Sequence, residues 1–203
     1  MTRYSAIPTT YKGIKFRSRL EAKWARMFDA LDWKWEYEPF DLNGWIPDFV
    51  FPARHRKVQT FTKDCNLIWK EIKGSQVAVE VKPVSGEDDP LFIQTTKEIE
   101  KSGWDHDALI VSYFLPEIND EPGLGWLGEY YEENNDSFWW EEAPFQETNI
   151  ASIPIGFCHS MGSYCDRVTG HCPGGSYGLP VPLQNVVKHF WNESTNDVQW
   201  IRK

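Results

Sequence analysis

The chain has 203 residues, of which 41% are hydrophobic and 15% aromatic, and its formal net charge is −9. This length and apolar content fit one domain, or one domain with a substantial appendage, and they exclude a disordered chain. No run of about 18 apolar residues occurs, and the first residues lack the apolar segment of a signal peptide, so we expect a soluble, cytoplasmic protein with no membrane partner.

The charge is divided unevenly along the chain. Residues 1–82 carry 15 Lys and Arg against 10 Asp and Glu, a net of +5. Residues 83–203 carry 6 against 20, a net of −14. We therefore expect the first part to be able to meet a polyanion, whereas the second part would repel one.

The beginning of the chain predicts a hairpin followed by a helix. Residues 11–16 are expected to form a hairpin or an extended segment. Apolar residues within 18–32 recur at helical spacing, as in an amphipathic helix that presents one apolar face. Ser18 and Glu21 have the spacing of a capping box, which favours a helix that opens at Ser18.

A mixed α/β core is expected to continue from this helix. Apolar runs bounded by turn-forming residues indicate strands, and acids followed by Pro90 indicate a second helix. In chain order the elements are strand, strand, strand, helix and strand, at residues 34–38, 45–51, 77–82, 87–102 and 108–113. Residues 52–73 form an irregular basic stretch with room for a hairpin. We expect an α/β fold with a mixed, mostly four-stranded sheet flanked by helices.

The composition changes after this core, and we divide the chain into a core at 1–114 and an extension at 115–203 that is acidic, aromatic and contains Cys and His. Residues 117–147 hold ten acids and no Lys or Arg. Three interpretations stay open: a solvated surface whose tryptophans pack inward, a surface for a protein partner, and a negatively charged lid that mimics DNA. Residues 182–200 predict a short amphipathic helix.

Charged residues in two of the expected strands indicate a site. Asp48 follows a proline at the front of the second strand, and Glu80 and Lys82 alternate with valines on the third. Successive side chains of a strand point to opposite faces, so Glu80 and Lys82 share one face. Two acids and a lysine on buried strands are costly unless something binds there, and a divalent metal with phosphate oxygens is the natural candidate. The alternatives are an exposed edge strand for Glu80 and Lys82 and a strand-entry residue for Asp48.

The order of these motifs resembles that of the PD-(D/E)xK nuclease superfamily. The superfamily pattern has a helical Glu, then Pro-Asp, then Glu-x-Lys, which the chain matches at Glu21, Pro47-Asp48 and Glu80-Val81-Lys82. Two further phrases, at 16–22 and 35–39, are similar to phage-type members. The resemblance covers roughly residues 12–113.

The resemblance implies a restriction-endonuclease-like core and a metal-dependent nuclease, in a phage-infected or bacterial cell, that acts on DNA. Asp48 and Glu80 would supply hard carboxylate oxygens to Mg²⁺ or Mn²⁺, with the Val81 carbonyl as a further ligand. The metal would polarise the scissile phosphate and lower the pKa of a bound water. Lys82 would orient or help to deprotonate that water, or neutralise the pentavalent phosphorane. Glu21 would bind the metal directly or through water; its alternative is to complete the capping box.

Basic residues crowd the first helix and the segment before it, where they suit contact with a phosphate backbone. The candidates for nucleic-acid contact are Lys15, Arg17, Arg19 and Lys23. The alternative for each of them taken singly is a solvated helix face.

The glycine-rich segment near the C-terminus contains soft metal ligands. Cys158, Cys165, His171 and Cys172 have the chemistry for a structural Zn²⁺. Their cysteine spacing lacks the short knuckle of common zinc sites, so a plain loop with free thiols is the alternative.

Two functions of different classes are therefore expected. The first is a Mg²⁺- or Mn²⁺-dependent nuclease that hydrolyses phosphodiester bonds of DNA. The alternative is a non-catalytic protein of the same fold that binds nucleic acid or protein as an inhibitor or assembly factor, which the acidic second half favours. A homodimer and a protein partner at the acidic surface of 117–147 are further hypotheses.

Overall fold

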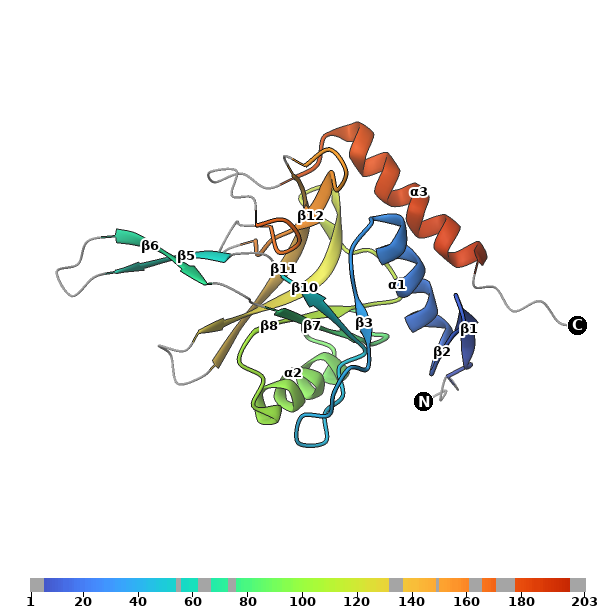
Figure 1. Cartoon of the computed structure of the whole chain (residues 1–203), viewed down its shortest axis with the longest axis horizontal. Coiled ribbons are helices and arrows are strands. Elements are labelled where there is room, and N and C mark those ends of the chain that lie inside the picture. The colour runs from blue at the N-terminus through green and yellow to red at the C-terminus, as the bar shows by residue number, and fades with distance from the viewer. Residues whose placement is uncertain are drawn as a thin grey trace, which may run out of the picture.

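The fold is known from a computed structural model of the chain. The structure describes eight ranges of residues, and every structural statement below concerns these ranges: 6–53, 56–61, 67–72, 76–131, 137–148, 150–160, 166–170 and 178–197. It is an α/β fold in which a large, curled, mixed sheet is accompanied by three helices (Figure 1). None of the described helices is both long enough and apolar enough to cross a bilayer.

The N-terminal hairpin and first helix form as the sequence predicts. Strands β1 (Thr9–Tyr11) and β2 (Ile14–Phe16) pair in antiparallel fashion across a turn whose two central residues, Lys12 and Gly13, both have positive φ. Helix α1 (Arg19–Ala30) follows. Its N-cap is Ser18, whose hydroxyl oxygen accepts a hydrogen bond of 3.1 Å from the Glu21 N–H, so the expected helix start is confirmed.

The main sheet contains eight strands, so the expectation of four is wrong. In space the order is β3 (Glu36–Tyr37), β4 (Phe49–Pro52), β7 (Gln76–Val81), β8 (Asp107–Val111), β10 (Glu121–Tyr131), β11 (Ser137–Glu147) and β12 (Ile155–Phe157). The short strand β9 (Glu117–Ile118) pairs with β10 away from this path. Strands β7 and β8 are parallel and are joined by helix α2 (Pro90–Ser102), whereas the other pairs are antiparallel. The sheet is therefore mixed, as expected.

The additional strands come from the acidic, aromatic stretch. Strands β10 and β11 form a long antiparallel hairpin, and β10 also pairs with β8. Trp126 and Trp140 of this hairpin pack against Phe92 of α2, while Trp139 is 43% exposed. The acidic composition of this stretch did not predict strands. They form because one side of the hairpin is buried against α2.

A second hairpin stands apart from the main sheet. Strands β5 (Arg56–Phe61) and β6 (Leu67–Ile72) pair only with each other and extend away from the body of the protein (Figure 1). It lies within the basic stretch at 52–73, where the sequence allowed a hairpin.

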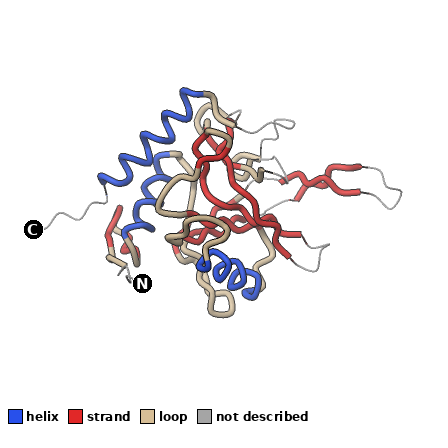
Figure 2. Tube along the Cα trace, turned by 180° about the vertical axis from the view of Figure 1, so that it is seen from behind, coloured by secondary structure: helices blue, strands red, loops and turns tan. Residues whose placement is uncertain are grey.

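Two apolar cores lie on the two faces of the sheet. The larger core joins α1 and helix α3 (Val181–Asp197) to one face, and the smaller core joins α2 to the other. Val77, Val79 and Val81 of β7 belong to the larger core, and Ala78 between them belongs to the smaller one. Helices α1 and α3 lie side by side, with α2 apart from them (Figure 2). The sheet and its larger core thus run without a break from the predicted core into the predicted extension.

Candidate functional site

The motif residues lie where β4 begins and β7 ends. Because β4 and β7 are antiparallel and Phe49 pairs with Val79, Asp48 comes to lie beside the end of β7. The Val81 N–H donates to Asp48 Oδ2 at 2.7 Å, which fixes this approach. Strand pairing thus brings together two motifs that are more than 30 residues apart.

Asp48 is 2% exposed, and both of its carboxylate oxygens accept hydrogen bonds. Oδ2 accepts from Val81, and Oδ1 accepts from Arg17 Nη2 at 2.5 Å. Burial, followed by repulsion from the Glu80 and Glu21 carboxylates, raises the pKa of Asp48 to about 7. The site therefore holds more negative charge than its buried position favours.

Glu80 is also buried, and it faces away from the valines of β7 as the alternation predicts. Trp45 Nε1 donates to Glu80 Oε2 at 3.1 Å, and the Lys82 ammonium contacts Oε1. Burial lowers the pKa of Lys82, but the charges of Glu80 and Asp48 outweigh this and raise it overall. Lys82 is therefore an ammonium paired with Glu80.

Glu21 lies on α1 and is 6% exposed. Its Oε2 accepts hydrogen bonds from the Tyr37 hydroxyl at 2.7 Å and from the Arg17 N–H at 3.0 Å. The capping box is thus present in part, because Ser18 caps the helix while the Glu21 carboxylate satisfies the N–H of the residue before Ser18.

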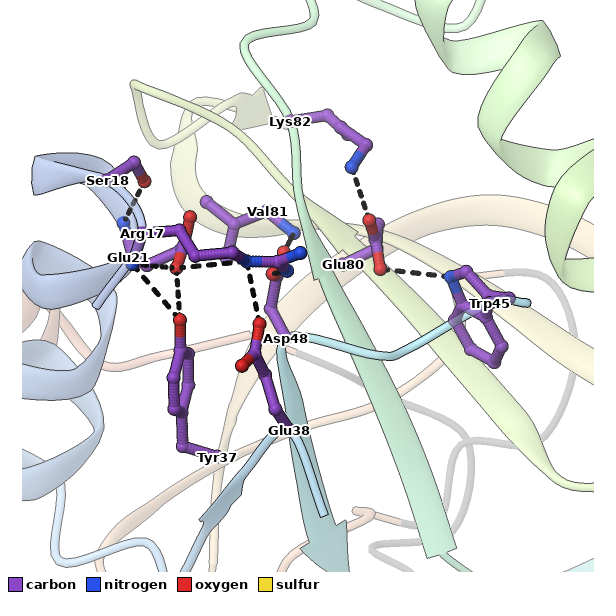
Figure 3. Close-up of polar contacts among 10 residues, drawn as sticks. All are labelled: Arg17, Ser18, Glu21, Tyr37, Glu38, Trp45, Asp48, Glu80, Val81 and Lys82. Carbon is purple, nitrogen blue, oxygen red and sulfur yellow. Dashed lines mark hydrogen bonds and ion pairs between the residues drawn. The ribbon is translucent and has the colours of Figure 1, made fainter. Parts of the chain in front are cut away.

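Arg17 joins the carboxylates of the site, a role that its place in a basic cluster did not predict. Figure 3 shows its guanidinium between Asp48 and Glu38, with Nε 2.6 Å from Glu38 Oε1 and 4.0 Å from Glu21 Oε2. Burial lowers the pKa of Arg17, and the carboxylates of Asp48, Glu38 and Glu21 raise it further than burial lowers it. The Trp35–Pro39 phrase of the sequence was a signal for this region, but it did not identify Glu38 as a partner.

The other candidates for nucleic-acid contact are placed differently from one another. Lys15 is exposed on β2. Arg19 is partly buried, and its Nε has no hydrogen-bond partner among the described residues. The Lys23 ammonium lies 3.1 Å from the ring centroid of Trp191 on α3, and burial lowers its pKa to about 8. Lys15 and Arg17 are therefore the exposed members of this set.

The zinc hypothesis falls largely on residues outside those described. Cys165, His171 and Cys172 lie there, while Cys158 and His159 are described and fully buried. Burial raises the pKa of the Cys158 thiol to about 12, and His159 Nε2 lies 3.1 Å from the Trp139 carbonyl oxygen. Structural zinc stays a prediction.

A buried ion cluster that the sequence reasoning missed lies farther along the sheet. Arg167 Nε contacts Asp107 Oδ2 at 2.7 Å, and Nη2 contacts Glu129 Oε1 at 3.2 Å, with all three side chains buried. Arg167 is the only Lys or Arg between residues 102 and 187, so an isolated base in an acidic region was the available signal. The cluster ties the segment after β12 to β8 and β10.

The donors at the first site fit a hard divalent cation by chemistry and charge. Four carboxylates, those of Glu21, Glu38, Asp48 and Glu80, are accompanied by two cationic side chains. Oxygen donors with this excess of negative charge suit Mg²⁺ or Mn²⁺.

The same donors are held by protein groups in the structure. In Figure 3, Arg17, Glu21 and Tyr37 lie on the α1 side of β7, and Glu80, Lys82 and Trp45 lie on the other side. Within the described ranges, no three His, Cys, Asp or Glu side chains are already grouped to hold an ion. To share one ion, the carboxylates would have to turn from their present partners. This geometry is the ground for proposing a function, since no protein-family model, curated protein or solved structure matches the chain.

Proposed function

We propose that the protein is a metal-dependent nuclease that hydrolyses phosphodiester bonds of DNA, with a restriction-endonuclease-like core of the PD-(D/E)xK kind and an origin in a phage or mobile element. The observation that carries this proposal is the pair of buried carboxylates, Asp48 and Glu80, at adjacent strand ends, with the Lys82 ammonium on Glu80. Buried carboxylates in excess of their counter-charges are costly unless a cation offsets them.

Each residue has a role that its contacts support. Asp48 and Glu80 would hold Mg²⁺ or Mn²⁺, with Glu21 near by on α1. When bound, such an ion polarises a phosphate and lowers the pKa of a water. Lys82 is paired with Glu80, so it carries a positive charge and is suited to orient the attacking water and to stabilise negative charge that develops on the phosphate.

The charged residues around the site constrain how DNA could approach it. Arg17 lies on the α1 side. On the α2 side, burial and the nearby carboxylates of Glu141 and Glu142 raise the pKa of Glu87, which precedes α2. We therefore propose that DNA lies across the end of β7, with the exposed Lys15 and Arg17 on the α1 side and Lys82 on the other, and that the acidic hairpin faces away from it.

The proposal is tested with the purified chain, plasmid DNA, and Mg²⁺ or Mn²⁺. We expect cleavage that is lost on adding a chelator. Asp48→Asn and Lys82→Met should each reduce the rate by roughly 10²-fold or more, because each removes charge at the reacting phosphate. Glu36→Gln is the matched control, since Glu36 is exposed on the neighbouring strand β3, and it should cleave like the wild type. Full activity in Asp48→Asn would refute the site.

A second candidate function is a non-catalytic binding module of the same fold, acting as an inhibitor or assembly factor. It is favoured by the engagement of both oxygens of Asp48 and of Glu80 with protein groups. Calorimetric titration with Mn²⁺ separates the two functions. Binding of Mn²⁺ to the wild type that is lost in Asp48→Asn supports the nuclease. Binding of DNA without binding of Mn²⁺ supports the binding module.

A further inference from the structure

Arg17 has a backbone held by hydrogen bonds and a side chain that is more than half exposed. Its N–H donates to Glu21 Oε2 at 3.0 Å and to the Tyr37 hydroxyl at 3.1 Å, so the residue is anchored at the start of α1. Its side chain is nevertheless 54% exposed, whereas that of Asp48, to which it reaches, is 3% exposed. The guanidinium can therefore move toward solvent without displacing the helix or the strand.

The exposure of the Glu38 side chain is intermediate between that of Arg17 and that of Asp48. Its side chain is 29% exposed, and its carboxylate contacts Arg17 Nε at 2.6 Å. Its backbone has φ of 45°, in the left-handed region that costs a non-glycine residue about 1 kcal/mol, and its N–H donates to the Asp48 carbonyl oxygen at 3.1 Å. Glu38 is thus held where it can keep contact with the Arg17 side chain near the surface.

The contact between Arg17 and Asp48 competes with any cation that would bind Asp48. Nη2 lies 2.5 Å from Oδ1, so the guanidinium occupies the space of a second cation at that oxygen. The other oxygen, Oδ2, is already held by the Val81 N–H. A divalent cation that binds Asp48 Oδ1 from the direction that Nη2 occupies must therefore displace Arg17.

We propose that Arg17 is an internal counter-ion that changes partners: it neutralises Asp48 in the metal-free protein, and on metal binding it turns outward to hold a backbone phosphate of the DNA. This inference rests on the proposed nuclease function and adds a control of the same site. A guanidinium binds carboxylates and phosphates through the same pair of parallel N–H donors, so one side chain can serve both. Arg17 is thus a positioning residue that couples metal loading to DNA contact.

The first test is calorimetric titration of the full chain with Mn²⁺ in the absence of DNA. Removing a partly exposed ion pair that competes with the metal should strengthen binding by about fivefold in Arg17→Gln. Lys34→Gln is the matched control, because it removes the same charge from a side chain that is 78% exposed and lies outside the site, and it should leave the Mn²⁺ affinity unchanged. Arg17→Lys keeps the charge but loses the planar group whose separate donors contact Asp48 and Glu38, and it should give an intermediate affinity.

The second test measures binding of a fluorescent DNA duplex in the presence of Mn²⁺, in a Lys82→Met background that is expected not to cleave. Adding Arg17→Gln should weaken DNA binding and reduce its dependence on salt by about one phosphate contact. The inference thus requires opposite changes in Arg17→Gln, with tighter binding of Mn²⁺ and weaker binding of DNA. A merely structural role would weaken both, and circular dichroism shows whether each variant is folded.

The outcomes separate this inference from the function on which it rests. If the wild type binds Mn²⁺ and Arg17→Gln and Arg17→Lys bind it no more tightly, the counter-ion role is refuted while the nuclease proposal stands. If Lys34→Gln gains as much Mn²⁺ affinity as Arg17→Gln, the effect is one of general charge and the inference is also refuted. If neither the wild type nor any variant binds Mn²⁺, both the proposed metal site and the inference are refuted.

Discussion

Most of the buried charged residues that the structure describes fall into two groups of different character. In the first, Asp48 and Glu80 are buried while Arg17, one of their counter-ions, is more than half exposed. In the second, Arg167, Asp107 and Glu129 are all at most 2% exposed. A site that acts on a ligand needs charged side chains that can exchange partners. In the first group, the partly exposed Arg17 is such a side chain. The second group is closed to solvent, which favours a structural role.

The structural role of the second group gives a prediction at Arg167. Arg167→Met removes the guanidinium that pairs with two buried carboxylates, and breaking a buried ion pair by removing one member costs about 3–5 kcal/mol. We expect a loss of that order in the free energy of unfolding, measured by urea denaturation and tryptophan fluorescence. Lys97→Met, on an exposed position of α2, is the control and should change stability little. A loss of less than about 1 kcal/mol would place Arg167 among surface ion pairs instead.

Among the elements, the strand pair β8–β10 connects the part of the chain that the sequence predicts well with the part that it does not. Gly125 lies in β10 where the two strands meet, and a Cβ at this position would lie 2.2 Å from the Ile110 carbonyl oxygen. A distance this short cannot be relieved by a side-chain rotation, because the neighbour is backbone. The absence of a side chain at Gly125 therefore allows the β10–β11 hairpin to extend the sheet.

Gly125→Ala should destabilise the protein, because the backbones of β8 and β10 would have to separate. We expect a loss of about 2 kcal/mol or more in the free energy of unfolding, in the range for a strained core substitution. Gly86→Ala is the matched control, since a Cβ at Gly86 has no atom within 4 Å and the residue is not among those with positive φ. Equal stability of the two variants in urea would contradict the assigned register of β10.

The predicted elements differ in how much local sequence determines them. Helix α1 and strands β4 and β7 were predictable from local properties: an apolar helical face with a cap at Ser18 for α1, an apolar run after turn-forming residues for β4, and alternation for β7. Strands β10 and β11 were not, because their burial depends on packing against α2 and β8 rather than on their own acidic composition. The positions of Asp48 and Glu80 follow from strand pairing, whereas the contact of Arg17 with Asp48 depends on the direction of one long side chain.

At the scale of the whole molecule, the two halves of the chain share one apolar core. Trp33 after α1 packs on Phe157 of β12 with ring centroids 5.2 Å apart, and its Nε1 donates to the Ile155 carbonyl oxygen at 2.8 Å. Trp24 of α1 packs on Trp191 of α3 at 4.7 Å. The helix that carries Glu21 is therefore supported by residues from the end of the chain, and the site depends on both halves.

This dependence can be tested by ending the chain at residue 114, the boundary that composition predicts. The shortened chain would expose the β8 edge that pairs with β10 and would lose Trp191 and Phe157, which pack on Trp24 and Trp33.

We expect residues 1–114 to give no cooperative unfolding transition by circular dichroism and poorly dispersed amide resonances by NMR, whereas the full chain should unfold cooperatively. The physical reason is that a chain of this size has little apolar area to lose before conformational entropy outweighs burial. Dispersed resonances from the shortened chain, together with retained Mn²⁺ binding, would show instead that the predicted core folds independently and that the C-terminal strands are an addition to a complete site.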